Sequence, residues 1–312
     1  MIIVIGASGF IGVHTVTELL KQGCKVLATG RNSKFKSYYD SIGVEYLNFD
    51  LSIDSDIQKL PKEGVEAVIL LAGLLPANAI VNLDEDENAS DYFRINVLGT
   101  INILEYCRKN NIKRVLSTCS YADVRGSWND SRRITEDEPR DFSYRGDHAV
   151  YVISKNAAND VMEYYNQQHG MKNVWFRLPT VYGVTPHMSF YVNGEKKKSG
   201  FQIFIEKAQV AENITVFGNP NMIRDVAYVK DVAHAFYLAI KSDSASGLYN
   251  MTAGHGVSLV EMAEVIRDVF GPTSGRKSQI LYNPNISNNT PSYLFSMEKA
   301  KREFAFEPHF KT

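Results

Sequence analysis

Tyr151 and Lys155 are the residues whose types and spacing suggest chemistry most directly. They stand four residues apart in a helix predicted to begin near Val150, so both side chains fall on one face. An ammonium about 4 Å from a phenol favours the phenolate by about 4 kcal/mol at an effective dielectric constant of about 20, which approaches about 3 pK units. Burial of the pair would oppose part of that shift. A tyrosine tuned in this way can exchange a proton with an alcohol.

The spacing of this pair carries little weight alone, but the start of the chain supplies a second element. The apolar run Ile2–Ile5 is joined by Gly-Ala-Ser-Gly-Phe-Ile-Gly at 6–12 to a segment whose apolar residues recur at helical spacing. This order predicts a strand, a glycine turn and a helix. A pyrophosphate can bind the first amides of such a helix, and glycines allow its close approach. We interpret the stretch as a dinucleotide-binding turn; a tight corner without a ligand is the alternative.

The end of the second predicted strand, Lys25–Thr29, bears on which dinucleotide the turn would hold. Arg31 follows the strand, and no carboxylate appears until Asp40. An acidic residue here would hydrogen-bond the adenosine ribose, whereas an arginine can pair with the 2′-phosphate of NADP. We therefore favour NADP over NAD, with a solvated arginine as the alternative. A third strand, Val44–Phe49, leads to Asp50, which is expected near the adenine unless it only serves a turn.

Two further predicted strands end in small or hydroxyl side chains. Ala67–Leu71 is almost uniformly apolar, as in a central parallel strand covered on both faces, and Ala72-Gly73 follows it. Small residues suit the close approach of a ligand, which in parallel sheets binds beyond the carboxyl ends of the strands. The strand Arg114–Ser120 ends in hydroxyl groups. Between these strands, Asn96 lies in a predicted helix over 91–109, where it either makes a polar contact or faces water.

The bulk composition excludes several classes of function. The chain has 312 residues, of which 44% are hydrophobic and 22% charged, as in an ordinary soluble globular protein. A net charge of −1 offers no footprint for nucleic acid or an anionic membrane. Neither a signal peptide nor an apolar run of about 18 residues is found, so we expect a cytoplasmic protein. Cys24, Cys107 and Cys119 are widely spaced, and we predict no metal site.

The order of these features resembles the extended short-chain dehydrogenase/reductases, the family of NAD(P)-dependent epimerases and dehydratases acting on nucleotide sugars. The resemblance covers nearly the whole chain. It is carried by Gly6–Gly12, Asp50-Leu51, Leu71-Ala72-Gly73, Asn96–Thr100, Tyr151–Lys155, Arg177–Gly183 and Arg224-Asp225. It implies an α/β fold with a doubly wound parallel sheet of the Rossmann type and a smaller C-terminal substrate-binding lobe.

The resemblance also implies roles for individual residues. Tyr151 would be the catalytic acid/base, and Lys155 would lower its pKa and bind the nicotinamide ribose. Ser120 would hydrogen-bond the reacting oxygen, with Asn96 supporting the same site. The cofactor would be bound by Gly6, Ser8, Gly9, Phe10, Ile11, Gly12, Arg31, Asp50, Leu51, Leu71, Ala72 and Gly73, together with Tyr151 and Lys155. Thr180 and Arg224 would face the substrate, where the family's arginine meets the phosphates of a sugar nucleotide.

The segment after the fifth strand departs from the family's pattern. The family's serine or threonine usually lies five residues before the glycine of a V-Y-G sequence. Here Val124-Arg125-Gly126 takes the place of that sequence, and Tyr121 stands five residues before its glycine. We assume a one-residue insertion and choose Ser120, with Thr118 as the second choice. Dehydratases place an Asp-Glu pair just after that hydroxyl to drive loss of water. Tyr121-Ala122 stands there instead, so dehydration is disfavoured.

Three departures lie nearer the C-terminus. Thr180 replaces the asparagine that sugar-nucleotide enzymes often have before V-Y-G. Asn-Asn-Thr-Pro at 288–291 occupies the region where many members present a second phosphate-binding arginine, which weakens the expectation of diphosphate recognition. The chain stops soon after Glu307-Pro308, where relatives commonly continue, and this leaves open whether its last helix is present.

Together these observations predict two parts of the chain. A dinucleotide-binding domain is expected over residues 1–178 and a substrate-binding lobe over 179–312, with part of 225–251 returning to the main sheet. Helices over 91–109 and 150–168 would form a homodimer in such a family.

The predicted function is an NAD(P)-dependent oxidoreductase that acts at a sugar carbinol through a ketone. Return of hydride to the other face of the ketone would make it an epimerase, and its expected substrate is a nucleotide sugar. A net NADP-linked reductase or dehydrogenase, which Arg31 favours, is the first alternative. A dinucleotide-binding sensor without catalysis is the second.

Overall fold

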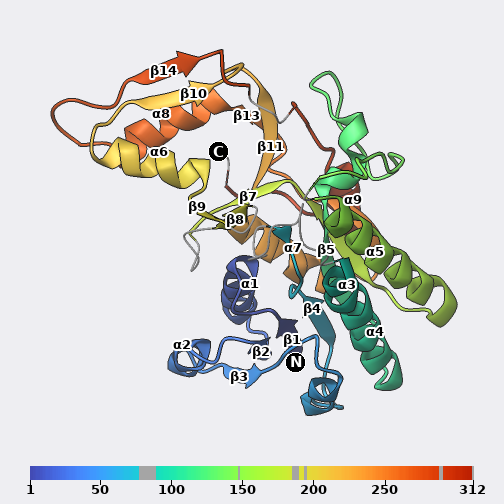
Figure 1. Cartoon of the computed structure of the whole chain (residues 1–312). Helices are drawn as coiled ribbons and strands as arrows, with labels where there is room; N and C mark the ends of the chain where they lie inside the picture. The colour runs from blue at the N-terminus through green and yellow to red at the C-terminus, as the bar shows by residue number, and fades with distance from the viewer. Residues whose placement is uncertain (77–88, 147, 185–189, 193–194, 288–290, 311–312) are drawn as a thin grey trace.

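The computed structural model describes residues 1–76, 89–146, 148–184, 190–192, 195–287 and 291–310 (Figure 1). Within these ranges, seven strands form one parallel sheet in the order β3-β2-β1-β4-β5-β6-β12. They are β1 (Ile2–Ile5), β2 (Val26–Gly30), β3 (Glu45–Asn48), β4 (Ala67–Leu70), β5 (Val115–Ser120), β6 (Val174–Leu178) and β12 (Gly247–Asn250). The order reverses between β1 and β4, where such sheets bind ligands beyond the carboxyl ends of the strands. The predicted doubly wound parallel sheet is confirmed.

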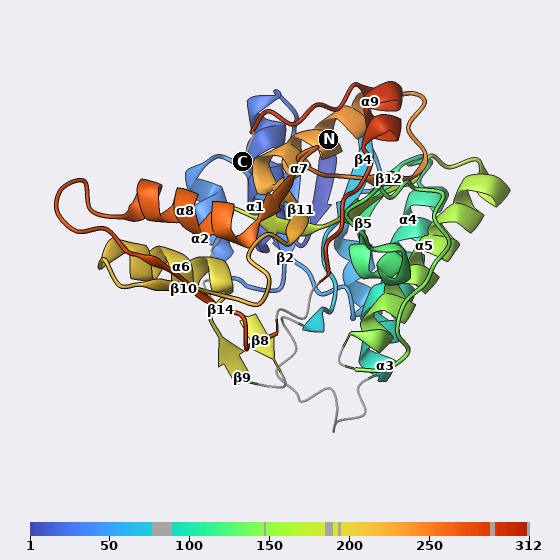
Figure 2. The ribbon, with the colours of Figure 1, turned by 90° about the horizontal axis from the view of Figure 1, so that it is seen from above.

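Helices cover both faces of this sheet (Figure 2). One face carries α1 (Phe10–Lys21), α7 (Val229–Lys241) and α9 (Glu298–Phe304), and the other carries α4 (Gly99–Lys109) and α5 (Ala149–His169). The remaining helical segments of this part are α2 (Phe35–Ser41), η1 (Asp54–Lys59), α3 (Ala89–Tyr92), the π-helix η3 (Phe93–Leu98) and η4 (Tyr121–Ser127).

The core lies in two layers, one on each face of the sheet. Successive side chains of a strand point to opposite faces, so Ile2 and Val4 join the layer under α1 and α7, while Ile3 and Ile5 join the layer under α4 and α5. All four β1 side chains are fully buried. Burial on both faces explains why β1 and β4 are continuous apolar runs rather than alternating ones.

A second group of elements lies at one end of the molecule, apart from β1–β3 (Figure 1). Helices α6 (Gly200–Gln209) and α8 (Leu259–Phe270) pack on the parallel strands β10 (Ile214–Phe217) and β14 (Ile280–Asn283). A separate sheet contains β7 (Thr180–Tyr182), β11 (Ile223–Tyr228) and β13 (Gly256–Ser258), and β8 (Phe190–Val192) pairs with β9 (Glu195–Lys197). Strand β12 pairs with β6 in the main sheet. The domain boundary near residue 178 stays a prediction.

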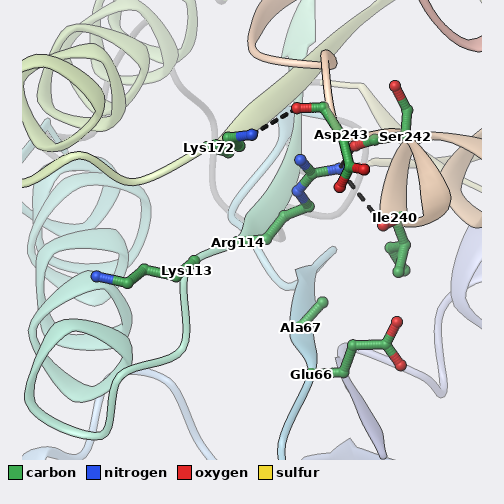
Figure 3. A pocket seen from close by; sticks show the side chains of 8 residues that line it. All are labelled: Glu66, Ala67, Lys113, Arg114, Lys172, Ile240, Ser242 and Asp243. Atoms are coloured by element: carbon green, nitrogen blue, oxygen red, sulfur yellow. Dashed lines mark hydrogen bonds between the residues drawn. The ribbon is translucent and has the colours of Figure 1, made fainter.

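Arg114 joins the main sheet to the end of α7, at the amino ends of the strands. Its guanidinium donates to the backbone oxygens of Ala239, Ser242 (2.6 Å) and Ala245 (3.3 Å). Figure 3 shows this arginine in a pocket beside Lys172, whose ammonium donates to the backbone oxygen of Asp243 at 2.6 Å. The last carbonyls of a helix lack partners within it, so Arg114 acts as a cap. This pocket lies at the edge opposite the predicted cofactor crevice.

We predict that Arg114→Ala lowers the free energy of unfolding by about 1–3 kcal/mol, because it leaves buried carbonyls without donors. Thermal unfolding followed by circular dichroism measures the effect. Lys113→Ala, which removes an exposed cation next to it, serves as the control. Equal midpoints for the two variants would contradict the capping role.

Candidate functional site

The glycine-rich turn joins the carboxyl end of β1 to α1. Gly6 has φ of +92°, and a Cβ there would lie 2.5 Å from the Ala72 nitrogen. A Cβ on Gly12 would collide with the carbonyl oxygen of Gly6. Both positions therefore need glycine, the first for its backbone conformation and both for close packing.

The start of α1 suits an anion such as the diphosphate of a dinucleotide. Gly9 occupies the N-cap position without a side-chain cap, and the first turn of the helix contains no carboxylate. The amides of Leu71 and Ala72 donate to the Ile5 oxygen at 2.8 and 2.9 Å, which draws the segment after β4 against the turn. These features fit a diphosphate, because helix amides and the helix dipole both favour negative charge.

The adenosine side of the predicted site is formed by residues that follow β2 and β3. Arg31 comes directly after β2 and is exposed. Asp50 accepts hydrogen bonds from the Ser52 amide (2.9 Å) and hydroxyl (2.7 Å), so it serves a local turn. Leu51 places its side chain in the core against Gly99. The contacts observed for Asp50 are thus those of a turn residue.

Tyr151 and Lys155 lie on α5, with Tyr151 in its first turn. Helix α5 packs against β5 and against η4, the turn that follows Ser120, and Tyr151 shares an apolar cluster with Ala122 of that turn. The ring of Tyr151 packs against Tyr92, with centroids 6.3 Å apart. The structure therefore brings this pair to the hydroxyl-rich end of β5.

The predicted lowering of the pKa of Tyr151 is not found in the chain itself. Burial is the largest influence on Tyr151 and raises its pKa. Burial also lowers the pKa of Lys155 to about 8. Removing charge from water disfavours both the phenolate and the ammonium, and in this site that effect outweighs their mutual attraction.

Asn96 lies in η3 and is buried. Its Oδ1 accepts from the Leu74 amide at 2.8 Å, and its Nδ2 donates to the Leu74 oxygen and to Ser154 Oγ, both at 3.0 Å. The Ser154 hydroxyl in turn donates to the backbone carbonyl oxygen of Tyr151 at 2.8 Å. Asn96 thus ties the segment after β4 to the first turn of α5.

Ser120 ends β5 and caps η4, where its Oγ accepts from the Ala122 amide at 3.2 Å. A buried ion pair holds the next turn: both guanidinium contacts of Arg177 to Asp123 measure 3.0 Å. Arg177 also donates to Asn250 Oδ1 at 3.1 Å. The pair fastens the segment after Ser120 to β6 and β12, so removing either partner would leave a buried charge.

The predicted substrate residues come together on neighbouring strands. Thr180 opens β7 and pairs with Val226 of β11, two residues after Arg224. Thr180 Oγ1 lies 3.2 Å from the Tyr293 hydroxyl oxygen. The backbones of Tyr293 and Arg224 pair in an isolated β-bridge. Burial lowers the pKa of Arg224. Asn288, Asn289 and Thr290, which the sequence placed in this region, lie outside the described residues.

Three aromatic residues of this region were missed from the sequence. Tyr121 and Trp128 stack with ring centroids 5.1 Å apart, and both pack on Tyr293 at 5.1 and 4.7 Å. Tyr121 was recognised only as a departure from the family's spacing. Tyr293 lies more than 160 residues away in the chain, so local patterns give no signal of the contact.

Two further findings concern the part of the chain that the structure describes. It contains no group of three or more His, Cys, Asp or Glu side chains arranged to hold a metal ion. None of its helices is both long and apolar enough to span a membrane.

A parallel sheet with a glycine-rich turn after its first strand, beside the point where the strand order reverses, is the arrangement of Rossmann-type dinucleotide-binding domains. The chain belongs to the NAD dependent epimerase/dehydratase family, whose model matches residues 2–252. The resemblance predicted from the sequence is thereby confirmed.

Relatives of this chain are named as UDP-sugar 4-epimerases. The chain is 29% identical over 279 residues to a putative UDP-glucose 4-epimerase of Methanocaldococcus jannaschii, covering 87% of this chain and 83% of the relative. It is 28% identical to a bifunctional UDP-glucose 4-epimerase and UDP-xylose 4-epimerase of Arabidopsis thaliana, covering 99% and 91%. The fold matches the UDP-glucose 4-epimerase of Thermus thermophilus solved with NAD, with a TM-score of 0.76 at 24% identity, covering 100% of this chain and 94% of the other.

The fold also matches a dehydratase. The dTDP-glucose 4,6-dehydratase of Bacillus anthracis, solved with NAD, has a TM-score of 0.75 at 21% identity, covering 99% and 92% of the two chains. Fold similarity therefore does not separate epimerases from dehydratases.

Asp225 supports a prediction about pH and stability. Its side chain is fully buried and accepts hydrogen bonds from Thr252 Oγ1 and the Phe295 amide (2.7 Å), and burial raises its pKa to about 6. The folded state therefore binds this proton more tightly than the unfolded state, whose carboxyl has a pKa of about 3.9. The resulting stabilisation is present below about pH 4 and is lost as pH rises through about 6.

We predict that Asp225→Asn gains stability relative to the wild type as pH rises from about 4 to 7, because the amide does not titrate. Thermal midpoints of both proteins across this range measure the difference. Asp137→Asn, at an exposed position, should show a constant difference. A constant difference for Asp225→Asn as well would contradict the prediction.

Proposed function

We propose that the protein is an NAD(P)-dependent epimerase acting on a nucleotide sugar, through a ketone, with a Ser-Tyr-Lys site. The observation that carries the proposal is that Tyr151 and Lys155 lie on one helix, which packs against β5 and the turn that follows Ser120. Membership of the family and relatives named as UDP-sugar 4-epimerases support the same assignment. The cytoplasmic location expected from the sequence is part of this proposal.

Each side chain has a distinct task in this proposal. Tyr151 removes the hydroxyl proton of the sugar and returns it when the carbonyl is reduced, and Lys155 supplies the positive charge that favours the phenolate. Ser120 donates a hydrogen bond to the reacting oxygen. A nicotinamide bound at the glycine-rich turn would supply the acceptor and donor of hydride. Asn96 keeps the first turn of α5 in place through Ser154.

Epimerisation is favoured over dehydration by the residues after Ser120. Tyr121 and Ala122 carry no carboxylate. Tyr121 instead packs in the aromatic group with Trp128 and Tyr293. Loss of water from a sugar needs an acid and a base near the leaving hydroxyl, whereas epimerisation needs only one proton-exchanging group beside the hydride carrier.

The nucleotide diphosphate is assigned to the surface formed by β7 and β11. Arg224 is the cation of this surface, and Thr180 and Tyr293 contribute hydroxyl groups beside it. A guanidinium binds phosphate oxygens through paired hydrogen bonds, which suits a sugar nucleotide.

We predict that Tyr151→Phe lowers the epimerisation rate by about a hundred- to ten-thousandfold, because the group that exchanges the proton is removed. Interconversion of UDP-glucose and UDP-galactose, followed by NMR, measures the rate. Tyr282→Phe, which changes an exposed tyrosine of β14, should leave the rate unchanged. Full activity of Tyr151→Phe would contradict the role of Tyr151, and a wild type that binds a dinucleotide without epimerising any nucleotide sugar would favour the sensor alternative.

We also propose NADP as the preferred dinucleotide, on the basis of Arg31 at the end of β2. We predict that Arg31→Ala weakens NADP binding about tenfold or more and leaves NAD binding nearly unchanged, because only NADP carries the 2′-phosphate. Calorimetric titration of the dinucleotide-free protein measures both constants. Tighter binding of NAD than of NADP by the wild type would contradict the preference.

A net NADP-linked reductase or dehydrogenase is the second candidate function, because Arg31 favours binding of NADP. We propose a homodimer through α4 and α5; Leu98, just before α4, and Tyr164 of α5 are each more than half exposed.

A further inference from the structure

Tyr39 of α2 lies beneath the glycine-rich turn, 32 residues away from it in the chain. Its side chain is fully buried, and its hydroxyl donates to the Ala7 carbonyl oxygen at 2.6 Å. The Ala7 amide donates to the Thr29 oxygen of β2 at 2.8 Å, and the Gly6 amide donates to the same oxygen at 3.1 Å. Both polar groups of the Ala7 backbone are therefore fixed, one by the sheet and one by Tyr39.

Tyr46 of β3 extends this contact toward the adenosine side. Its ring stacks on Tyr39, with centroids 5.3 Å apart and planes 7° from parallel. Its hydroxyl donates to the Asn32 oxygen at 2.9 Å and accepts a hydrogen bond from Ser8 of the turn. A Cβ on Gly30 would lie 2.6 Å from the Ser8 hydroxyl oxygen and 2.6 Å from that of Tyr46. The side chains of Ser8 and Tyr46 therefore cover the end of β2.

We infer that Tyr39 is a positioning residue for dinucleotide binding, which orients the turn at residues 6–9 through its hydrogen bond to Ala7. The inference rests on the proposed function, because it assumes that the turn binds the diphosphate. Tyr39 does not face the ligand. It fixes the direction of the peptide units that precede α1, and a helix N-terminus binds phosphate well only when these amides are already aligned.

Tyr39→Phe tests the inference, since it keeps the ring and its stacking on Tyr46 but removes the hydroxyl. Titration of the full chain, freed of bound dinucleotide, with NAD, NADP and ADP gives the dissociation constants. We expect each constant to rise about three- to tenfold, the effect of one hydrogen bond. Adenosine, which carries no phosphate and is followed by ligand-observed NMR, should bind the variant and the wild type equally.

Tyr38→Phe is the matched control, because Tyr38 is the partly exposed neighbour of Tyr39 on the same helix. It should leave all four constants unchanged. Equal binding of NAD, NADP and ADP by Tyr39→Phe and the wild type would overturn the inference while leaving the proposed function in place. An equal loss for adenosine, together with a lower thermal midpoint, would show a purely structural role and also overturn it. A wild type that binds neither dinucleotide would overturn both.

Discussion

The close approach of the glycine-rich turn to the end of β4 is the constraint on which the rest of the site depends. The Ile5 oxygen accepts both amides of Leu71 and Ala72, and this contact leaves no room for a side chain on Gly6. It sets the first amides of α1 beside the carboxyl ends of the two strands at which the sheet order reverses. Every other functional residue is placed relative to this corner.

Buried polar contacts then hold the irregular segments against the sheet. Asn96 joins the segment after β4 to α5, Arg177 joins the turn after Ser120 to β6, and Asp225 joins β11 to the segment around Phe295. A buried polar group left without a partner is costly, so each contact favours one arrangement of its loop. The residues proposed for catalysis and substrate binding thus lie on or beside elements whose positions are set from within the core.

The fold and the order of the site elements could be predicted from the sequence, because they follow from local patterns. The apolar runs predicted the central strands, and the spacing of Tyr151 and Lys155 placed them on one helix face. The aromatic contact between Trp128 and Tyr293 could not be predicted, since it joins distant parts of the chain. The extent to which burial raises the pKa of Tyr151 could not be predicted, because it depends on the assembled core.

The proposed mechanism requires that hydride leaves a sugar carbon and returns to the same carbon within one site. UDP-glucose carrying deuterium at C4, incubated with the protein in ordinary water, tests it most directly. The account predicts UDP-galactose that keeps the deuterium at C4, without net change in coenzyme absorbance. Loss of the deuterium to solvent, or steady coenzyme turnover without the epimer, would contradict it.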